Sequence, residues 1–417
     1  MVDEAHNLLD RARDMYSASL ESEEIRTFRS SVRGVWPGLW KKLGRCLRTV
    51  RALPEPEEAY VLLDDISPLA DALQDARSAV GKILESQRKG EGAGQTEEKR
   101  ALQESLLEFY FETGHFLDMY DKAEEDYVFY REGKKEARVR LFCVDPARSL
   151  KACMDRGTAS ILFSATLLPI QYFKGLLGGT AEDYEIYARS VFDPARRGVF
   201  VVNDVTSRYS ARSDREYERI ADSIHRIVSC RHGNYLVFFP SYAFLSMTAK
   251  AYLEKYPETE DCRILLQSEG MAPEERAAYL EAFEEVRDDS ALLGFGVLGG
   301  MFAEGIDLRE DRLIGVLVIG TGIPGVCSER QILKDYFDER GESGFDYAYR
   351  FPGMNKVLQA GGRVIRTARD VGAVALLDER FAQSQYRKLF PAEWKDYEIV
   401  SSDRVGERLA RFWDSWL

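Results

Sequence analysis

The sequence predicts an α/β protein whose larger part is a doubly wound parallel sheet. From about residue 185, short apolar runs alternate with amphipathic segments of helical period and about 10 to 15 residues. The apolar runs are bounded by turn or helix-start residues, which is typical of buried parallel strands. In such sheets ligands bind at the carboxyl ends of the strands, so the residues that follow each run are the first place to look for function.

The expected elements follow from this rhythm. We expect strands at 199–202, 235–239, 263–266, 292–297, 314–319 and 373–377, and helices at 214–229, 241–255, 273–287 and 355–367. Two earlier apolar runs, Val139–Val144 and Ala159–Phe163, also have the character of buried parallel strands. Residues 21–135 differ from the rest, because apolar residues recur there at helical spacing around a flexible connector at Gly90–Gly94.

Length and charge limit the classes of protein. The 417 residues are enough for two or three domains with cores of their own. No apolar run approaches the ~20 residues of a membrane span, and Met1–His6 has neither a charged leader nor an apolar signal core, so we expect a cytoplasmic protein without a membrane partner. The net charge of −13 argues against nucleic-acid binding over the whole surface.

One local basic track stands out against this acidic background. Residues 26–51 contain eight Lys or Arg and no Asp or Glu. Arg45 and Arg48 are candidates for contact with a single DNA strand, and Trp36 and Trp40 could serve as stacking platforms. Tryptophans four residues apart in a helix are more often buried packing residues, so we favour packing for the tryptophans and DNA for some of the arginines.

The cysteines do not suggest a metal centre. The six are dispersed without a C-x-x-C pair, at Cys46, Cys143, Cys153, Cys230, Cys262 and Cys327. A zinc site or a four-cysteine iron–sulfur cluster within this chain is therefore not expected.

Polar residues follow several of the expected strands. Asp3 and Glu4, in Asp-Glu-Ala-His, have the form of a strand end whose paired carboxylates could hold Mg²⁺ and orient an attacking water. Ser164 and Thr166 follow the run that ends at residue 163, and they could simply cap a helix. Ser241 and Tyr242 follow another strand, where a helix cap and a contact with a nucleic-acid backbone are both open.

Two later stretches are more specific. Gly299–Leu308 is a glycine-rich loop between strands with carboxylates at Glu304 and Asp307. The stretch from Gln359 to Arg366 reads Gln-Ala-Gly-Gly-Arg-Val-Ile-Arg. We expect Arg363 and Arg366 on one face of a helical turn, where two permanently charged planar donors could meet a phosphate. A solvated basic turn is the competing interpretation of this octapeptide alone.

The order of these motifs resembles that of superfamily-two helicases of the XPD/DinG type. Asp-Glu-Ala-His, a long helical insertion, Ser-Ala-Thr-Leu, Phe-Pro-Ser, Glu-Gly-Ile-Asp-Leu and Gln-x-x-Gly-Arg-x-Ile-Arg follow one another from Asp3 to about Phe381. The resemblance implies RecA-like motor domains and an arch-like insertion. It divides the chain into the end of motor domain 1 (1–20), the insertion (21–135), the remainder of motor domain 1 (136–184) and motor domain 2 (185–417).

The resemblance also implies roles. Asp3 would hold Mg²⁺ and Glu4 would serve the hydrolytic water, while Ser164 and Thr166 would couple nucleotide state to DNA. Glu304, Gly305 and Asp307 would lie between nucleotide and DNA, with Gly305 and Asp307 on the ATP side. Gln359, Arg363 and Arg366 would reach the triphosphate of ATP, with Arg366 as the arginine finger. The family unwinds or remodels DNA with 5′→3′ polarity.

One departure from the family's pattern limits the activity that we expect. The phosphate loop G-x-x-x-x-G-K-[ST] is absent from the 417 residues. In the family, this loop and the iron–sulfur cysteines precede the acidic box. We therefore expect this chain to be a C-terminal portion of a helicase and to be inactive alone. The iron–sulfur cluster of the parent protein is unknown, since its cysteines would lie before the acidic box. The partners expected are DNA, single-stranded or forked, and the other part of the motor. The alternative is a non-catalytic nucleic-acid-binding or regulatory module derived from such a motor, and the DNA sequence upstream of Met1 would separate the two.

Overall fold

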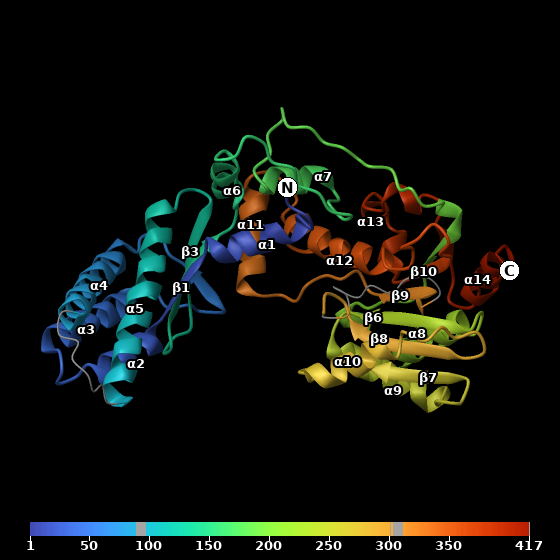
Figure 1. The fold of residues 1–417 in the computed structure, drawn as a ribbon, viewed down its shortest axis with the longest axis horizontal. Helices are drawn as coiled ribbons and strands as arrows, with labels where there is room; N and C mark the ends of the chain where they lie inside the picture. Colours follow the sequence, from blue (N-terminus) through green and yellow to red (C-terminus); the bar gives the residue numbers. More distant parts are fainter. Residues whose placement is uncertain (89–96, 301, 303–311, 417) are drawn as a thin grey trace. The chain divides into compact units, whose positions relative to one another are not determined.

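The computed structural model describes residues 1–88, 97–300, 302 and 312–416 (Figure 1). The chain forms two compact units. Unit 1 comprises residues 1–164, 172–183 and 326–342, and unit 2 comprises residues 165–171, 184–325 and 343–417.

Unit 2 is built on a seven-stranded sheet with the order β11-β5-β10-β9-β6-β8-β7. All neighbouring strands in this sheet are parallel. The strands are β5 (Arg197–Val202), β6 (Gly233–Phe239), β7 (Cys262–Leu266), β8 (Ala291–Val297), β9 (Gly315–Ile319), β10 (Gly372–Leu377) and β11 (Glu398–Val400). Each strand expected after residue 185 is present within about two residues, and β11 is an additional edge strand.

Helices cover both faces of this sheet, and alternate residues of the strands enter one of two cores. In β6, Tyr235, Val237 and Phe239 enter the core under α8, α9 and α14, whereas Leu236 and Phe238 enter the core under α10, α12 and α13. The helices are α8 (Asp214–Val228), α9 (Tyr242–Lys255), α10 (Pro273–Glu281), α12 (Phe351–Gly361), α13 (Ser384–Arg387) and α14 (Val405–Asp414). Burial on both faces explains the continuous apolar runs of the sequence and confirms the predicted doubly wound fold.

Unit 1 combines helices with a small antiparallel sheet of order β1-β4-β3-β2. Its strands are β1 (Ala18–Glu21), β2 (Tyr60–Leu62), β3 (Tyr127–Glu132) and β4 (Arg138–Cys143). Its helices are α1 (His6–Met15), α2 (Ser22–Ser31), α3 (Pro37–Ala52), α4 (Ser67–Arg88), α5 (Glu97–Lys122), α6 (Ala147–Met154) and α11 (Ser328–Glu339), and α7 (Ile170–Leu176) crosses from unit 2 into unit 1. One core joins α2 to α5 with the sheet.

Two expectations about strands in this part were wrong. The run Val139–Val144 forms most of β4, but its pairing with β1 and β3 is antiparallel. The run Ala159–Phe163 forms no strand, and only Leu162 pairs, through a parallel bridge to Val2. Ile161 and Phe163 are exposed there, because no sheet in the described part of the chain covers them.

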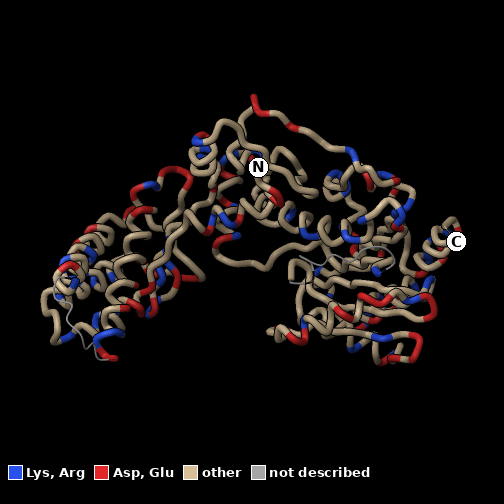
Figure 2. The backbone as a smooth tube through the Cα atoms, viewed as in Figure 1, with Lys and Arg blue, Asp and Glu red and all other residues tan. Residues whose placement is uncertain are grey.

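Acidic and basic residues are interspersed along both units, as Figure 2 shows on the backbone. Among the described residues, no helix is both long enough and apolar enough to cross a bilayer.

The close packing of β9 against β6 allows a test of the fold. A Cβ at Gly315 would lie 2.4 Å from Cδ1 of the buried Tyr235 ring. We expect Gly315→Ala to lower the free energy of unfolding by about 1–3 kcal/mol, because the core must shift to admit the methyl group. Gly325→Ala is the control, since nothing lies within 4 Å of its Cβ position. Equal urea midpoints for the two variants would contradict this packing.

Candidate functional site

The first site cluster brings together residues that are about 160 positions apart. Ser164 Oγ donates a hydrogen bond of 3.0 Å to Glu4 Oε2, and His6 Nδ1 lies 2.8 Å from Ser164 Oγ. His6 Nδ1 also lies 3.3 Å from Glu4 Oε2. Backbone bonds from Val2 N to Ile161 O and from Ala5 N to Phe163 O align the two segments. The Asp-Glu-Ala-His box and Ser164, the first residue of the Ser-Ala-Thr segment, therefore meet within unit 1.

The two carboxylates of this cluster are open to solvent. Asp3 and Glu4 are exposed, and the Glu4 backbone has a φ of 48°, which is uncommon for a residue other than glycine. Asp3 Oδ1 accepts a hydrogen bond of 2.7 Å from the Glu4 backbone N–H. Within the described residues, no group of three His, Cys, Asp or Glu side chains could enclose a metal ion. Two exposed carboxylates suit Mg²⁺, which keeps several waters and binds through one or two carboxylates plus substrate phosphates.

Thr166 belongs to unit 2 and is held by helix α12. Its side chain is buried, and its backbone carbonyl accepts a hydrogen bond of 2.6 Å from Asn355 Nδ2. Asn355 lies one turn before Gln359 on the same helix. The end of the Ser-Ala-Thr segment is therefore fixed to the helix that leads into the octapeptide.

The octapeptide does not form the helical turn that we expected. Helix α12 ends at Gly361, where a Cβ would lie 2.5 Å from the Trp394 ring, and the chain leaves the helix there. Arg363 is buried, Arg366 is exposed, and Gln359 is half-buried. Asp370 fixes the loop, because its Oδ2 accepts hydrogen bonds from the backbone N–H groups of Arg366 (2.6 Å) and Thr367 (2.8 Å). The two arginines thus follow the helix in a fixed loop and do not share one helical face.

Glycines of the loops at the carboxyl edge of the sheet lie against residues of helix α12. Gly320 and Gly322 follow β9 with φ values of 81° and 67°, which favour glycine. A Cβ at Gly322 would lie 2.5 Å from the carbonyl oxygen of Gly353 on α12, so the two backbones touch. A Cβ at Gly299 would lie 3.0 Å from Nζ of Lys356, a cation that our sequence reasoning did not select. Glu304, Gly305 and Asp307, the other predicted residues of this edge, lie outside the described residues.

Ser241 and Tyr242 have structural partners at the same edge. Ser241 caps α9, since its Oγ accepts a hydrogen bond from Phe244 N. Tyr242 Oη accepts a hydrogen bond of 3.0 Å from Gln267 Nε2, and Gln267 Oε1 accepts one of 2.8 Å from Val297 N. These bonds tie the ends of β6, β7 and β8 together. A role of Ser241 and Tyr242 in DNA binding stays a prediction.

The basic track of unit 1 is only partly available for a ligand. Trp36 and Trp40 pack against the core of unit 1, as we favoured, and the guanidinium of Arg29 lies 4.0 Å above the Trp40 ring. Arg45 Nη1 donates a hydrogen bond of 2.7 Å to Asp75 Oδ2. Arg48 is exposed. The arginines on this surface therefore differ in how much of their charge is already compensated.

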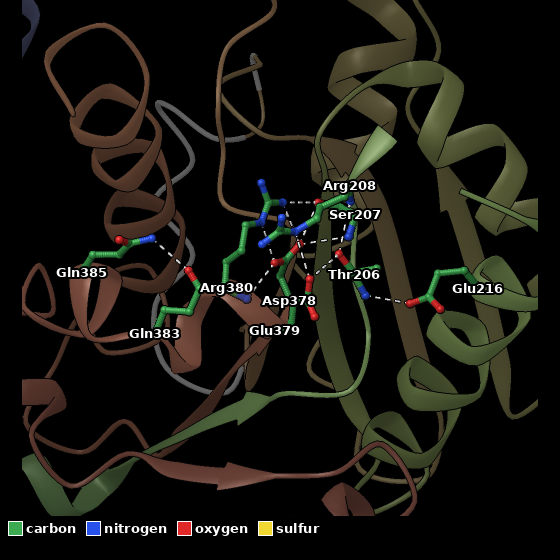
Figure 3. A network of polar contacts seen from close by, with 9 residues as sticks. All are labelled: Thr206, Ser207, Arg208, Glu216, Asp378, Glu379, Arg380, Gln383 and Gln385. Atoms are coloured by element: carbon green, nitrogen blue, oxygen red, sulfur yellow. Dashed lines mark hydrogen bonds and ion pairs between the residues drawn. The ribbon is translucent and has the colours of Figure 1, made fainter. Parts of the chain in front are cut away.

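A buried ion pair next to β10 was missed by the sequence reasoning (Figure 3). Asp378 is fully buried, and Arg380 donates to it from Nε (2.7 Å to Oδ1) and from Nη2 (2.8 Å to Oδ2). Ser207, in the loop after β5, donates to Asp378 Oδ2 through its backbone N–H (2.9 Å) and its hydroxyl (2.8 Å). Asp378 directly follows the apolar run 373–377. It could have been found as a polar residue that follows an expected strand, which is how the other residues were found.

The pKa of Asp378 reflects this environment. Burial acts to raise the pKa, but the hydrogen bonds and charge of Arg380 and the backbone N–H of Ser207 outweigh it. The pKa of the carboxyl is therefore below its usual value, and the pKa of Arg380 is raised by the same pair. The ion pair fixes the loop after β5 to the end of β10.

Comparison with known proteins agrees with this geometry. Residues 224–397 match the helicase C-terminal domain. "ATP-dependent DNA helicase XPD" of Sulfolobus acidocaldarius is 26% identical over 401 residues, covering 93% of this chain and 66% of the relative. "ATP-dependent DNA helicase chl-1" of Caenorhabditis elegans is 25% identical over 295 residues, covering 67% of this chain and 35% of the relative. The structure titled "Structure of S. tokodaii Xpd4" covers 96% of this chain and 75% of that chain, with a TM-score of 0.59 and 15% identity, which supports the fold.

Unit 2 has the RecA-like fold of a helicase C-terminal domain. The chain is a relative of the superfamily-two helicases of the XPD type, so the resemblance inferred from the motif order is confirmed. The chain spans about two thirds of one of the two curated relatives above and about a third of the other.

The ion pair next to β10 gives a test of the site. We expect Asp378→Ala to lower the free energy of unfolding by about 3–5 kcal/mol, because the variant leaves the Arg380 charge buried without its partner. Glu379→Ala is the matched control, since Glu379 pairs with Arg208 at 2.9 Å in solvent and should cost less than about 1 kcal/mol. Chemical denaturation of both variants measures the difference.

The same pair has a pH signature. The pKa of Asp378 is lower in the folded protein than in the unfolded chain. Its contribution to the free energy of unfolding is therefore fully present above the unfolded pKa of about 3.9 and is lost as pH falls through the folded pKa. The stability difference between wild type and Asp378→Ala should be constant above about pH 5 and should shrink below about pH 4. A difference that grows on acidification would contradict the assigned charge state.

Proposed function

We propose that this chain is part of an ATP-dependent DNA helicase that couples ATP hydrolysis to 5′→3′ unwinding or remodelling of DNA. The observation that carries the proposal is the cluster of Glu4, His6 and Ser164. Two motifs almost 160 residues apart meet through a hydrogen bond of 3.0 Å between Ser164 Oγ and Glu4 Oε2. A movement of the Glu4 carboxylate would therefore displace Ser164. Ser164 begins the segment that continues to Thr166, whose carbonyl accepts a hydrogen bond from Asn355 on α12.

The roles of the residues follow from the charges that they carry. Asp3 would hold Mg²⁺, and Glu4 would orient the attacking water. Bound Mg²⁺ would neutralise charge on the phosphates of ATP during hydrolysis. Arg366 is exposed on a loop that Asp370 fixes, and it supplies positive charge to the transferred phosphate, together with Arg363 and Gln359.

DNA is the proposed macromolecular ligand, in single-stranded or forked form. The basic track around Arg45 and Arg48 guides a strand on unit 1, and the α9 start at Ser241 and Tyr242 contacts the backbone on unit 2. The other part of the motor, with a phosphate loop, is the proposed protein partner. The location in the cytoplasm stays a prediction of the sequence. The second candidate function is a non-catalytic nucleic-acid-binding or regulatory module derived from such a motor.

The first test concerns ATP turnover. We expect the purified 417-residue chain to bind single-stranded DNA but to hydrolyse no ATP above background, because the backbone amides and lysine of a phosphate loop are absent from its sequence. Phosphate release with and without DNA measures this.

Two outcomes would change the proposal. DNA-stimulated turnover that Arg366→Ala abolishes and Arg369→Ala preserves would refute the predicted inactivity and support the arginine finger. Failure of the chain to bind any DNA would refute the helicase proposal itself.

The second test concerns the basic track. We expect the double variant Arg45→Glu and Arg48→Glu to weaken single-strand affinity and to reduce the slope of log K against log salt by about 1.4, the value for two lost phosphate contacts at ~0.7 each. The matched control is Lys99→Glu with Arg100→Glu, two exposed cations at the start of α5 in the same unit. An unchanged slope in the first variant would remove the DNA role of this surface.

A further inference from the structure

The loop after β5 carries an aromatic side chain that its surroundings do not cover. Tyr209 begins a short 3₁₀ turn (Tyr209–Ala211), and 85% of its surface is exposed. A tyrosine this exposed leaves apolar ring surface in water without any packing benefit. We propose that Tyr209, together with Arg212, is a stacking site for a base of single-stranded DNA, a proposal that rests on the proposed function.

The exposure of Tyr209 does not result from a loosely held loop. Immediately before it, Ser207 is bound to the buried Asp378, and the Arg208 Nε lies 2.9 Å from Glu379 Oε1 (Figure 3). Thr206 N donates a hydrogen bond of 2.7 Å to Glu216 Oε1 on α8. After the turn, Ser213 caps α8 by accepting a hydrogen bond from Glu216 N. Both ends of the turn are therefore fixed, and the ring is presented on a rigid support.

Arg212 completes the site from one side. Its guanidinium carbon lies 5.1 Å from the centre of the Tyr209 ring and 5.2 Å from the centre of the Phe244 ring, so the cation is within cation–π distance of both rings. Its Nε is buried and has no hydrogen-bond partner in the described structure. A cation held against one face of Tyr209 leaves the other face for a planar ligand, and its charge attracts a phosphodiester chain.

The chemistry of the loop selects a nucleic-acid strand. Residues 205–213 contain two arginines and no Asp or Glu, and since Arg208 is paired with Glu379, Arg212 is the cation that this loop offers to a ligand. An exposed aromatic ring beside cations is the arrangement with which proteins bind single strands without sequence preference, because every base offers a flat π face. Phe244 belongs to the first turn of α9, so the site lies beside Ser241 and Tyr242, the residues proposed to contact the backbone. A base on Tyr209 would therefore extend the same strand path.

The experiment measures binding of a fluorescein-labelled dT oligonucleotide to the full 417-residue chain by fluorescence anisotropy. We expect Tyr209→Ala to weaken binding about 5- to 160-fold, the range for loss of one stacked base, and Tyr209→Phe to bind within about twofold of wild type. The slope of affinity against salt should stay unchanged in Tyr209→Ala, because no phosphate contact is removed. Tyr184→Ala is the control, since Tyr184 is 98% exposed in another loop of unit 2 and should have no effect.

The outcomes separate this site from the function on which it rests. Wild-type affinity in Tyr209→Ala would overturn the stacking site and leave the helicase proposal intact. An equal loss in Tyr209→Phe would also overturn it, because the hydroxyl rather than the ring would then be responsible. Absence of DNA binding by the wild-type chain would overturn both. A specific loss of binding to another protein, with DNA affinity unchanged, would assign the surface to a protein partner instead. Circular dichroism establishes that each variant is folded.

Discussion

The parallel direction of all seven strands in unit 2 is the constraint on which its functional surface depends. Parallel strands deliver every following loop to the same edge of the sheet. The loops after β5, β9 and β10 therefore meet, and Gly320 shows how closely: a Cβ there would lie 2.4 Å from Ser207 Oγ. Ser207 in turn binds Asp378. The parallel direction of the strands thus brings Tyr209 and the buried pair of Asp378 and Arg380 to the same edge of the sheet.

The two units carry predicted site residues of opposite charge. Unit 1 carries the exposed carboxylates of Asp3 and Glu4, and unit 2 carries Arg363 and Arg366 in the loop that precedes β10. Exposed carboxylates in general suit a hydrated metal ion, and guanidinium groups suit phosphate oxygens. The Ser-Ala-Thr segment is one of the places where the chain passes from one unit to the other, since Ser164 belongs to unit 1 and Thr166 to unit 2.

The sequence predicted the sheet of unit 2 well, for a physical reason. Strands buried on both faces are apolar throughout, so runs such as 235–239 cannot be mistaken for loops. The sequence does not reveal the small sheet of unit 1, because β1 has only four residues. The run that forms β4 suggests a strand buried on both faces, although Arg138 and Arg140 alternate with its buried residues. That alternation is the mark of a sheet covered on one face, where antiparallel pairing is usual.

The sequence predicts which residues belong to the candidate site better than it predicts the contacts between them. The acidic box and Ser164 were selected separately, and no local rule places residues 160 positions apart in contact. The octapeptide was taken for a helical turn because the spacing of its arginines fits one. The end of α12 instead depends on Trp394, which packs against Gly361 from more than 30 residues away, and on Asp370, which fixes the loop beyond. Both are tertiary partners that the spacing of arginines does not encode.

The contact between Gly322 and Gly353 has a consequence for how this protein can change over evolutionary time. Each backbone occupies the space in which the other residue would place a side chain, and a Cβ at Gly353 would lie 2.7 Å from the carbonyl oxygen of Thr321. Replacement of either glycine alone by a residue with a Cβ would push the end of β9 away from α12. We therefore expect glycine to be retained at both positions together, and substitutions in α12 to accumulate at its other residues.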